Sequence, residues 1–325
     1  MTVVEDALRL FTDRTGLPSS TIHLLGYVGS ISHGTHTPSE DPASIDDVDL
    51  MGIVIPPPER VLGGTAEWEH VVIQEGVIDA VFYSLRKASG LLMKANPNIV
   101  GLLWLDPTFY PIRTGIGQQL IVRRDLFATT ACYHSFIGYA YGQLHRMEAF
   151  DTSRMDEYEW LTGRLIQFYP IREVLEADAM KLAHIIRALD GTLNADQVHR
   201  FRSLHKQYFS GYMGEKRKKI VREKGYDTKN AAHLIRLMRM CCEFLVTGRL
   251  VVNRAGLDAE ELKAIKRGDW SIAEVKAEAE SLFARAKDLR ASATLPERSD
   301  PEAVARLVSA LHLSAWQLAS LGDPT

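Results

Sequence analysis

The sequence predicts an α+β fold in which a mixed sheet core with flanking helices is followed by a mostly α-helical domain. Four β-rich runs bounded by turn residues fall within the first third of the chain. After about Pro111 such runs nearly vanish, and long stretches with helical periodicity replace them. We therefore expect two domains, the first covering residues 1–112 and the second residues 113–325.

The first domain is expected to begin with a helix over residues 4–15, whose apolar residues recur with helical spacing. Its strands are predicted from runs rich in β-branched and apolar residues, over 22–28, 48–55, 70–74 and 77–83. Gly76 separates the last two strands and predicts a hairpin. A polar loop is expected over residues 31–45, and a helix over 84–95 is expected to stop at Asn96-Pro97-Asn98.

The second domain is predicted to consist of long helices with an apolar stripe on one side. They are expected over residues 123–150, 171–190, 194–210, 227–248, 271–291 and 300–320. The last is a C-terminal amphipathic helix, which is expected to pack as a cap or against a second subunit. The sequence leaves the oligomeric state open.

Composition excludes several classes of protein. The formal net charge of −3 gives no global attraction to nucleic acid or to anionic lipid. No apolar run reaches the roughly 18 residues of a membrane span, and the N-terminus lacks the layout of a secretory signal. The three cysteines, Cys132, Cys241 and Cys242, form no CxxC pair, so a cytoplasmic location is expected.

Three aspartates are the strongest candidates for chemistry. Asp47 and Asp49 alternate along the start of a predicted strand, so their side chains point the same way and repel each other. Asp79 lies among apolar residues of a later strand, where a charge needs a partner. A hard cation such as Mg²⁺ would compensate this charge. The alternatives are that Asp47 and Asp49 cap a turn, and that Asp79 faces water or pairs with an arginine.

A basic row is predicted on the helix over 227–248. Lys229, His233 and Arg236 are spaced i, i+4 and i+7, so they share one helix face beside an apolar stripe. This row could clamp a triphosphate, or it could be a solvated face of a core helix. The basic run over 215–219 could likewise contact a nucleic-acid backbone or simply face solvent. His33, His36 and His70 lack metal-ligand spacing and are assigned no chemistry.

These motifs together resemble a known family. Gly29-Ser30, the Asp47-x-Asp49 pair and the later Asp79 are similar to the signature of the DNA polymerase β nucleotidyltransferase superfamily. Within that superfamily, the chain resembles the RNA-ligase-associated (RlaP-type) nucleotidyltransferases over about residues 25–280. Two further segments carry the likeness: Leu91 to Asn98, which resembles a Leu-rich helix ending in Asn-Pro-Asn, and Tyr226 to Arg236, which resembles a motif of the helical domain.

The resemblance implies a nucleotidyltransferase-type sheet core and a set of site residues. The implied catalytic and metal-binding residues are Asp47, Asp49 and Asp79, and the implied nucleotide-binding residues are Gly29, Ser30, Gly34, Lys229, His233 and Arg236. The sequence departs from the family pattern in two places. His33 stands where the family usually has an aromatic residue such as Tyr, and the loop between Gly34 and Asp47 is longer than usual.

The implied activity is transfer of a nucleoside monophosphate from a nucleoside triphosphate to an acceptor hydroxyl, with Mg²⁺ or Mn²⁺ as the cofactor. An RNA end is one acceptor that the resemblance suggests. The same core could instead modify a protein side chain or a small molecule. It could also serve without catalysis, as a nucleotide-binding or scaffold protein.

Overall fold

The computed structural model describes residues 2–36, 47–63, 68–148, 152–189, 191–208 and 215–321. The chain forms two compact units, one made of Met1–Gln143 with Ala232–Thr325 and the other of Leu144–Ala231. The division passes through two long helices, α7 (Ala131–Glu148) and α13 (Thr228–Thr247). Each unit is described by itself below.

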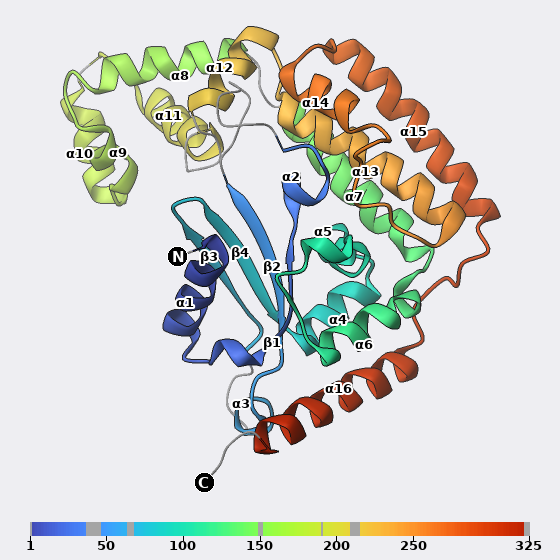
Figure 1. Cartoon of the computed structure of the whole chain (residues 1–325). Helices are drawn as coiled ribbons and strands as arrows, with labels where there is room; N and C mark the ends of the chain where they lie inside the picture. The colour runs from blue at the N-terminus through green and yellow to red at the C-terminus, as the bar shows by residue number, and fades with distance from the viewer. Residues whose placement is uncertain are drawn as a thin grey trace. The chain divides into compact units, whose positions relative to one another are not determined.

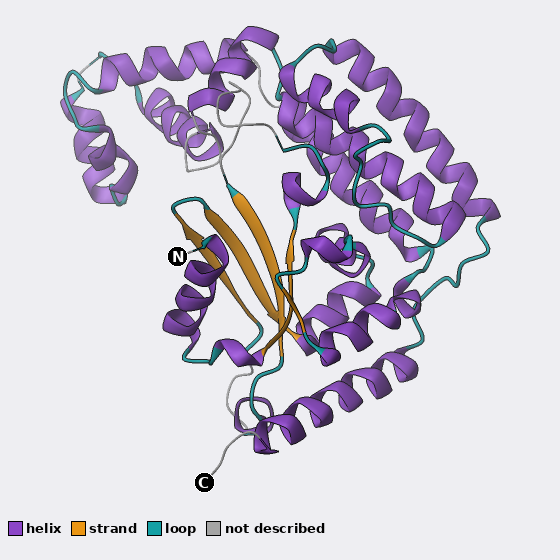
Figure 2. Cartoon of the chain, in the orientation of Figure 1, coloured by secondary structure: helices purple, strands orange, loops and turns teal. Residues whose placement is uncertain are grey.

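The first unit contains a mixed five-stranded sheet in the order β3-β4-β2-β1-β5. Figure 2 shows the strands in orange. The strands are β1 (Ile22–Tyr27), β2 (Val48–Val54), β3 (His70–Glu75), β4 (Ile78–Ser84) and β5 (Ile112–Arg113). β2 and β4 pair in parallel, and the other neighbours pair in antiparallel fashion. The four predicted strands and the β3–β4 hairpin at Gly76 are therefore confirmed, together with the α+β class.

One face of the sheet is covered by α1 (Val3–Thr15), and α4 (Leu85–Met93) and α6 (Gly115–Val122) lie on the other side (Figure 1). Leu50, Ala80 and Phe82 point toward α1, where they pack with Phe11 in one apolar cluster. Because side chains alternate along a strand, Asp49 and Asp79 belong to the opposite face. The sheet thus has an apolar core on one side and carries both aspartates on the other.

The first unit contains further α-helices besides α7 and α13. They are α2 (Gly29–Ser32), α3 (Pro58–Leu62), α5 (Pro97–Val100), α14 (Ala259–Arg267), α15 (Ile272–Ser292) and α16 (Pro301–Leu321). The predicted C-terminal helix, α16, packs on α4 and α6, and Trp316 Nε1 donates to the carbonyl oxygen of Pro56 at 2.9 Å. Within the described chain, no helix is both long and apolar enough to cross a membrane.

The second unit is helical throughout its described residues. It contains α8 (Thr152–Leu165), α9 (Ile171–Glu176), α10 (Ala179–Ala188), α11 (Ala195–Tyr208) and α12 (Glu215–Lys224) around an apolar cluster of their own. The prediction of one helix over 171–190 is wrong, because the chain breaks at Ala177 and Asp178 caps a new helix by accepting a hydrogen bond from the Lys181 N–H.

The single helix expected over 123–150 is also wrong at its start. A 3-10 turn over Arg124–Phe127 precedes α7, which begins only at Ala131. The predicted domains, 1–112 and 113–325, were defined by secondary structure, and every described strand lies at or before Arg113. The compact units follow contacts instead, so the boundary near residue 112 stays a prediction.

Candidate functional site

The site is built around a turn that only glycine can form. Gly29 has a φ of 63°, in the left-handed region, and directly begins the single-turn helix α2. A Cβ atom placed on Gly29 would overlap Oδ2 of Asp49, so the Asp49 carboxylate lies against the turn. The Val28 N–H donates to the Asp49 carbonyl oxygen at 2.9 Å, which fixes the start of β2 beside the turn. Ser30, in the first turn of α2, is half-buried.

Asp49 and Asp79 are direct neighbours across the parallel pair of β2 and β4. Paired residues on adjacent strands, about 4.8 Å apart, project from the same face of the sheet. Two carboxylates in this arrangement repel each other unless a cation lies between them. Gln74 of β3 stands opposite Asp79, and its Nε2 donates to Asp79 Oδ2 at 3.4 Å. The structure therefore brings together two of the three predicted aspartates.

Asp47 immediately precedes β2 and is half-buried, two residues before Asp49. The predicted loop between Gly34 and Asp47 lies largely outside the described residues, which resume at Asp47. In the ranges that the structure describes, no group of three or more His, Cys, Asp or Glu side chains is arranged to hold a metal ion. The in-register pair of Asp49 and Asp79 is thus what the structure contributes to the metal hypothesis, and the three-aspartate ligand set stays a prediction.

Arg236 of α13 belongs to the same region of the first unit. Its Nη1 donates to Nε2 of His33 at 2.7 Å and to the Met240 sulfur at 3.5 Å. Burial lowers the pKa of Arg236 to about 10, and the nearby charge of Arg254 adds to this effect, whereas Asp258 and Asp49 oppose it. The attraction to Asp49 connects this guanidinium electrostatically with the aspartate pair.

The sequence predicts no chemical role for His33, yet its side chain contacts Arg236 directly. Because an arginine nitrogen can only donate, His33 Nε2 must accept, and the proton therefore resides on Nδ1. Nδ1 is 2.9 Å from the carbonyl oxygen of Val252, to which it donates. Burial, followed by the charge of Arg236, holds the pKa of His33 well below its usual value, so the ring is neutral at pH 7. The available signal was its place at the end of α2, next to the Gly29-Ser30 motif.

Gly34 follows with a φ of 66° and lies against the segment 253–255. A Cβ on Gly34 would come within 3.2 Å of Ala255 and of Asn253 Oδ1. The Arg254 N–H donates to the His33 carbonyl oxygen at 3.1 Å, so this segment is joined to the end of α2. The positive φ and this close packing explain why glycine occupies position 34, and a role of Gly34 in nucleotide binding stays a prediction.

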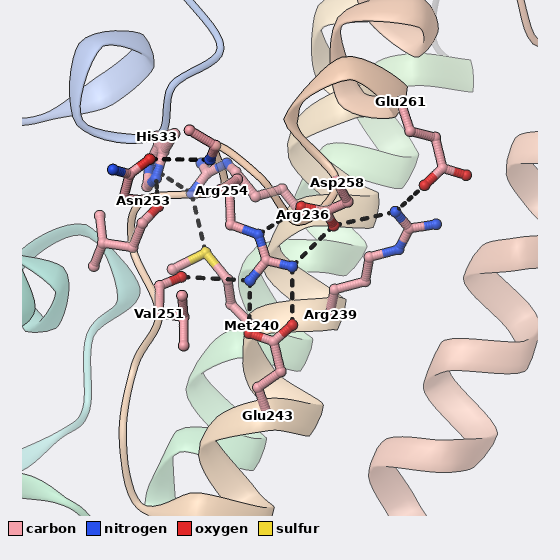
Figure 3. Close-up of polar contacts among 12 residues, drawn as sticks. His33, Arg236, Arg239, Met240, Glu243, Val251, Asn253, Arg254, Asp258 and Glu261 are labelled. Carbon is pink, nitrogen blue, oxygen red and sulfur yellow. Dashed lines mark hydrogen bonds and ion pairs between the residues drawn. The ribbon is translucent and has the colours of Figure 1, made fainter.

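A network of arginines and carboxylates fixes the segment that follows (Figure 3). Arg254, only 2% exposed, donates to both oxygens of Glu243 at 2.6 and 2.9 Å and to both oxygens of Asp258 at 2.7 and 2.9 Å. Arg239 reaches Asp258 at 3.1 Å, Glu261 at 2.5 Å and Glu278 at 2.8 Å. Both guanidinium charges are thus compensated by acids.

The other basic residues singled out in the sequence fall in different places. His233 and Arg236 lie on the part of α13 that belongs to the first unit, whereas Lys229 belongs to the second unit. In the basic run, Arg217 donates to both oxygens of the buried Asp227, at 3.2 and 2.7 Å, and so contributes to the fold of the second unit. Nucleotide binding by Lys229 and His233 and nucleic-acid contact by the basic run stay predictions.

The mixed sheet and the aspartate pair are consistent with the DNA polymerase β nucleotidyltransferase class. The chain belongs to the RlaP family, described as the RNA repair pathway DNA polymerase beta family, whose model matches residues 4–195. The matched segment includes Gly29, His33 and the three aspartates and ends before Arg236. No curated protein and no solved structure matches the chain.

Proposed function

We propose that this protein is a Mg²⁺-dependent nucleotidyltransferase that transfers a nucleoside monophosphate from a nucleoside triphosphate to an acceptor hydroxyl. The observation that carries the proposal is the in-register pair of Asp49 and Asp79 on adjacent parallel strands, with the Asp49 carboxylate against the Gly29 turn. Two carboxylates on one face of a sheet provide the oxygen ligands that Mg²⁺ prefers. The family supports the same class of reaction.

In this proposal Asp49, Asp79 and Asp47 hold the metal. Bound Mg²⁺, or Mn²⁺ in its place, would neutralise triphosphate charge and lower the pKa of the acceptor hydroxyl. Gly29 and Ser30 place the turn beside the phosphates, and Arg236 supplies a positive charge near Asp49. The chain's own contribution is therefore positioning and electrostatic stabilisation.

The bond changes balance without a further reactant. The acceptor oxygen forms a bond to the α-phosphorus, and the bond from that phosphorus to the bridging oxygen breaks. Pyrophosphate leaves with the electron pair, and the proton of the acceptor hydroxyl passes to solvent. Because the family is described by RNA repair, an RNA 3′-hydroxyl is the acceptor we propose first.

Transfer of label from each of the four NTPs to RNA, DNA or protein tests the proposal. Asp49→Asn and Asp79→Asn should each lower Mg²⁺-dependent transfer by about 100-fold or more, because each removes charge stabilisation from the reacting centre. Asp13→Asn, at an exposed position on α1, is the matched control and should retain activity.

Four outcomes bear on the proposal and its alternatives. Label on RNA supports the proposal, and label on protein or on a small molecule supports the alternative acceptor. Binding of NTP without transfer to any acceptor would support a nucleotide-binding or scaffold role. Full transfer by both aspartate variants would contradict the metal assignment.

A further inference from the structure

We propose that His33 is a positioning residue for nucleotide binding, which holds Arg236 at the end of α2, the helical turn whose first residue lies against Asp49, as a cation for the triphosphate. This inference rests on the proposed function and adds to it a residue that acts through Arg236. It depends on the 2.7 Å contact between His33 Nε2 and Arg236 Nη1 and on the way in which the imidazole itself is held.

His33 is held by its place at the end of α2 and by the segment 252–254. His33 ends α2, so its backbone position follows from the Gly29-Ser30 turn. Its carbonyl oxygen accepts from the Arg254 N–H at 3.1 Å, and its Nδ1 donates to the Val252 carbonyl oxygen at 2.9 Å. Only Nε2 is then left to accept a hydrogen bond, and it faces α13. The ring therefore connects the turn beside Asp49 to the guanidinium of Arg236.

A neutral acceptor suits this position better than a carboxylate. A carboxylate would hold Arg236 as firmly but would cancel its charge, as Glu243 and Asp258 do for Arg254. The imidazole orients the guanidinium and leaves its positive charge uncompensated by that contact. The bonds to His33 and to Met240 both use Nη1, so neither occupies Nη2 or Nε. A planar guanidinium held at one corner can direct its other donors to a phosphate.

A purely structural role for His33 gives a different expectation. In that case His33 would serve only to pack the 252–254 segment against α2, and any substitution that weakens this packing would lower stability. The positioning role instead predicts that only loss of the Nε2 acceptor affects the nucleotide. Three substitutions separate these roles because they mimic different ring atoms.

The variants are His33→Gln, His33→Asn and His33→Phe. The Gln amide can place an oxygen near the Nε2 position and accept from Arg236, whereas the Asn amide can reproduce only the donation to Val252. Phe removes both interactions while filling the space. We expect His33→Gln to retain NTP affinity within about threefold, and His33→Asn and His33→Phe to weaken it by about tenfold, the effect of losing a hydrogen bond to a charged group.

The readouts are equilibrium binding of a fluorescent Mg·NTP analogue, the KM for NTP, the kcat of transfer and the Tm. Weaker binding by both His33→Asn and His33→Phe, with recovery in His33→Gln, supports the inference. In an Arg236→Met background His33→Phe should weaken binding no further, because the residue through which it acts is gone. Equal affinity of His33→Phe and the wild type, or an undiminished loss in the Arg236→Met background, would overturn it.

The two proposals fail in different ways. Because binding is measured without turnover, loss of NTP affinity through His33 and Arg236 supports this inference even if no acceptor is found. Transfer that requires Asp49 but does not respond to His33→Phe overturns the inference and leaves the proposed function standing. A wild-type protein that binds no Mg·NTP overturns both.

Discussion

Two arginines of the first unit, Arg254 and Arg236, occupy neighbouring but opposite environments (Figure 3). Arg254 makes two bidentate contacts, with Glu243 and Asp258. Arg236 donates to a neutral imidazole and to a thioether. Burial lowers the pKa of both guanidinium groups, but at Arg254 the hydrogen bonds that it donates to Asp258 and Glu243 outweigh this effect and raise the pKa. At Arg236 burial prevails and the pKa falls to about 10.

The difference separates a structural cation from one that is available to a ligand. The charge of Arg254 is used within the protein, where it fixes the segment that carries Val252 and Asp258. Burial of the Arg236 guanidinium is unfavourable, and the charges of Asp258 and Asp49 offset this cost only in part. A bound triphosphate would offset the rest, and the charge of Asp49 already acts on this guanidinium. Four experiments can break or sharpen this comparison.

The largest effect on stability is expected from Arg254→Met. The substitution removes a guanidinium that is only 3% exposed and leaves the 13% exposed Asp258 without this partner. Loss of one member of a buried pair costs about 3–5 kcal/mol of unfolding free energy, and we expect the lower end, about 3 kcal/mol, because Glu243 is 34% exposed. Urea denaturation at pH 7 measures the loss. Arg9→Met, at a pair that is about half exposed, is the control and should cost less than about 1 kcal/mol. A loss for Arg254→Met no larger than that of the control would contradict the structural role.

The dependence of stability on pH in the acid range should show the contribution of the ionised Asp258 carboxylate. Burial alone would raise the pKa of Asp258, but the hydrogen bonds and charges of Arg254 and Arg239 lower it below its ordinary 3.8. A carboxyl with a depressed folded-state pKa contributes stability above its unfolded value and loses it as pH falls through the folded value. The wild type should therefore exceed Asp258→Asn in unfolding free energy at pH 7, and the gap should narrow below about pH 4. A gap that is independent of pH would contradict this assignment.

Arg239→Met should have a smaller effect than Arg254→Met. The Arg239 side chain is 16% exposed, against 3% for Arg254, and two of its partners, Glu261 and Glu278, are 40% and 30% exposed. Water can therefore solvate these groups when the arginine is removed. We expect a loss of about 1–2 kcal/mol, between the values for exposed and for buried pairs. The same denaturation series measures it. A loss equal to that of Arg254→Met would show that exposure of the partners does not set the cost.

Arg236→Met should have the smallest effect on stability. Met retains an apolar stem and removes a charge whose burial is unfavourable, so the unfolding free energy should change by less than about 1 kcal/mol in either direction. A loss comparable with that of Arg254→Met would place Arg236 among the structural arginines and contradict the comparison.

Much of the sheet could be predicted, because strand signals are local. The alternation of Asp47 and Asp49 and the acid inside a later apolar run pointed to one face of the sheet, and the register of Asp49 with Asp79 agrees with that expectation. β5 escaped prediction because it has only two residues. The helix predicted over 171–190 failed because the Asp178 cap competes with helical periodicity.

The contacts of the arginines could not be predicted from the sequence. His33 and Arg236 are 203 positions apart, and no local pattern relates a histidine at the end of a helical turn to one of the two arginines on a distant helix. The row of Lys229, His233 and Arg236 was found from its spacing, but spacing does not tell which arginine of α13 meets acids and which meets a neutral ring. That distinction follows from the fold alone.

Titration of a non-hydrolysable Mg·NTP analogue into the wild type, Arg236→Met and Arg239→Met by calorimetry tests the central claim most directly. Arg236→Met should raise the dissociation constant by about tenfold to 100-fold, the effect of losing a charge-assisted hydrogen bond. The dissociation constant of Arg239→Met should stay within about threefold of the wild-type value. Equal affinity of all three proteins, or an equal loss in both variants, would contradict the claim that Arg236 is the cation held ready for the triphosphate.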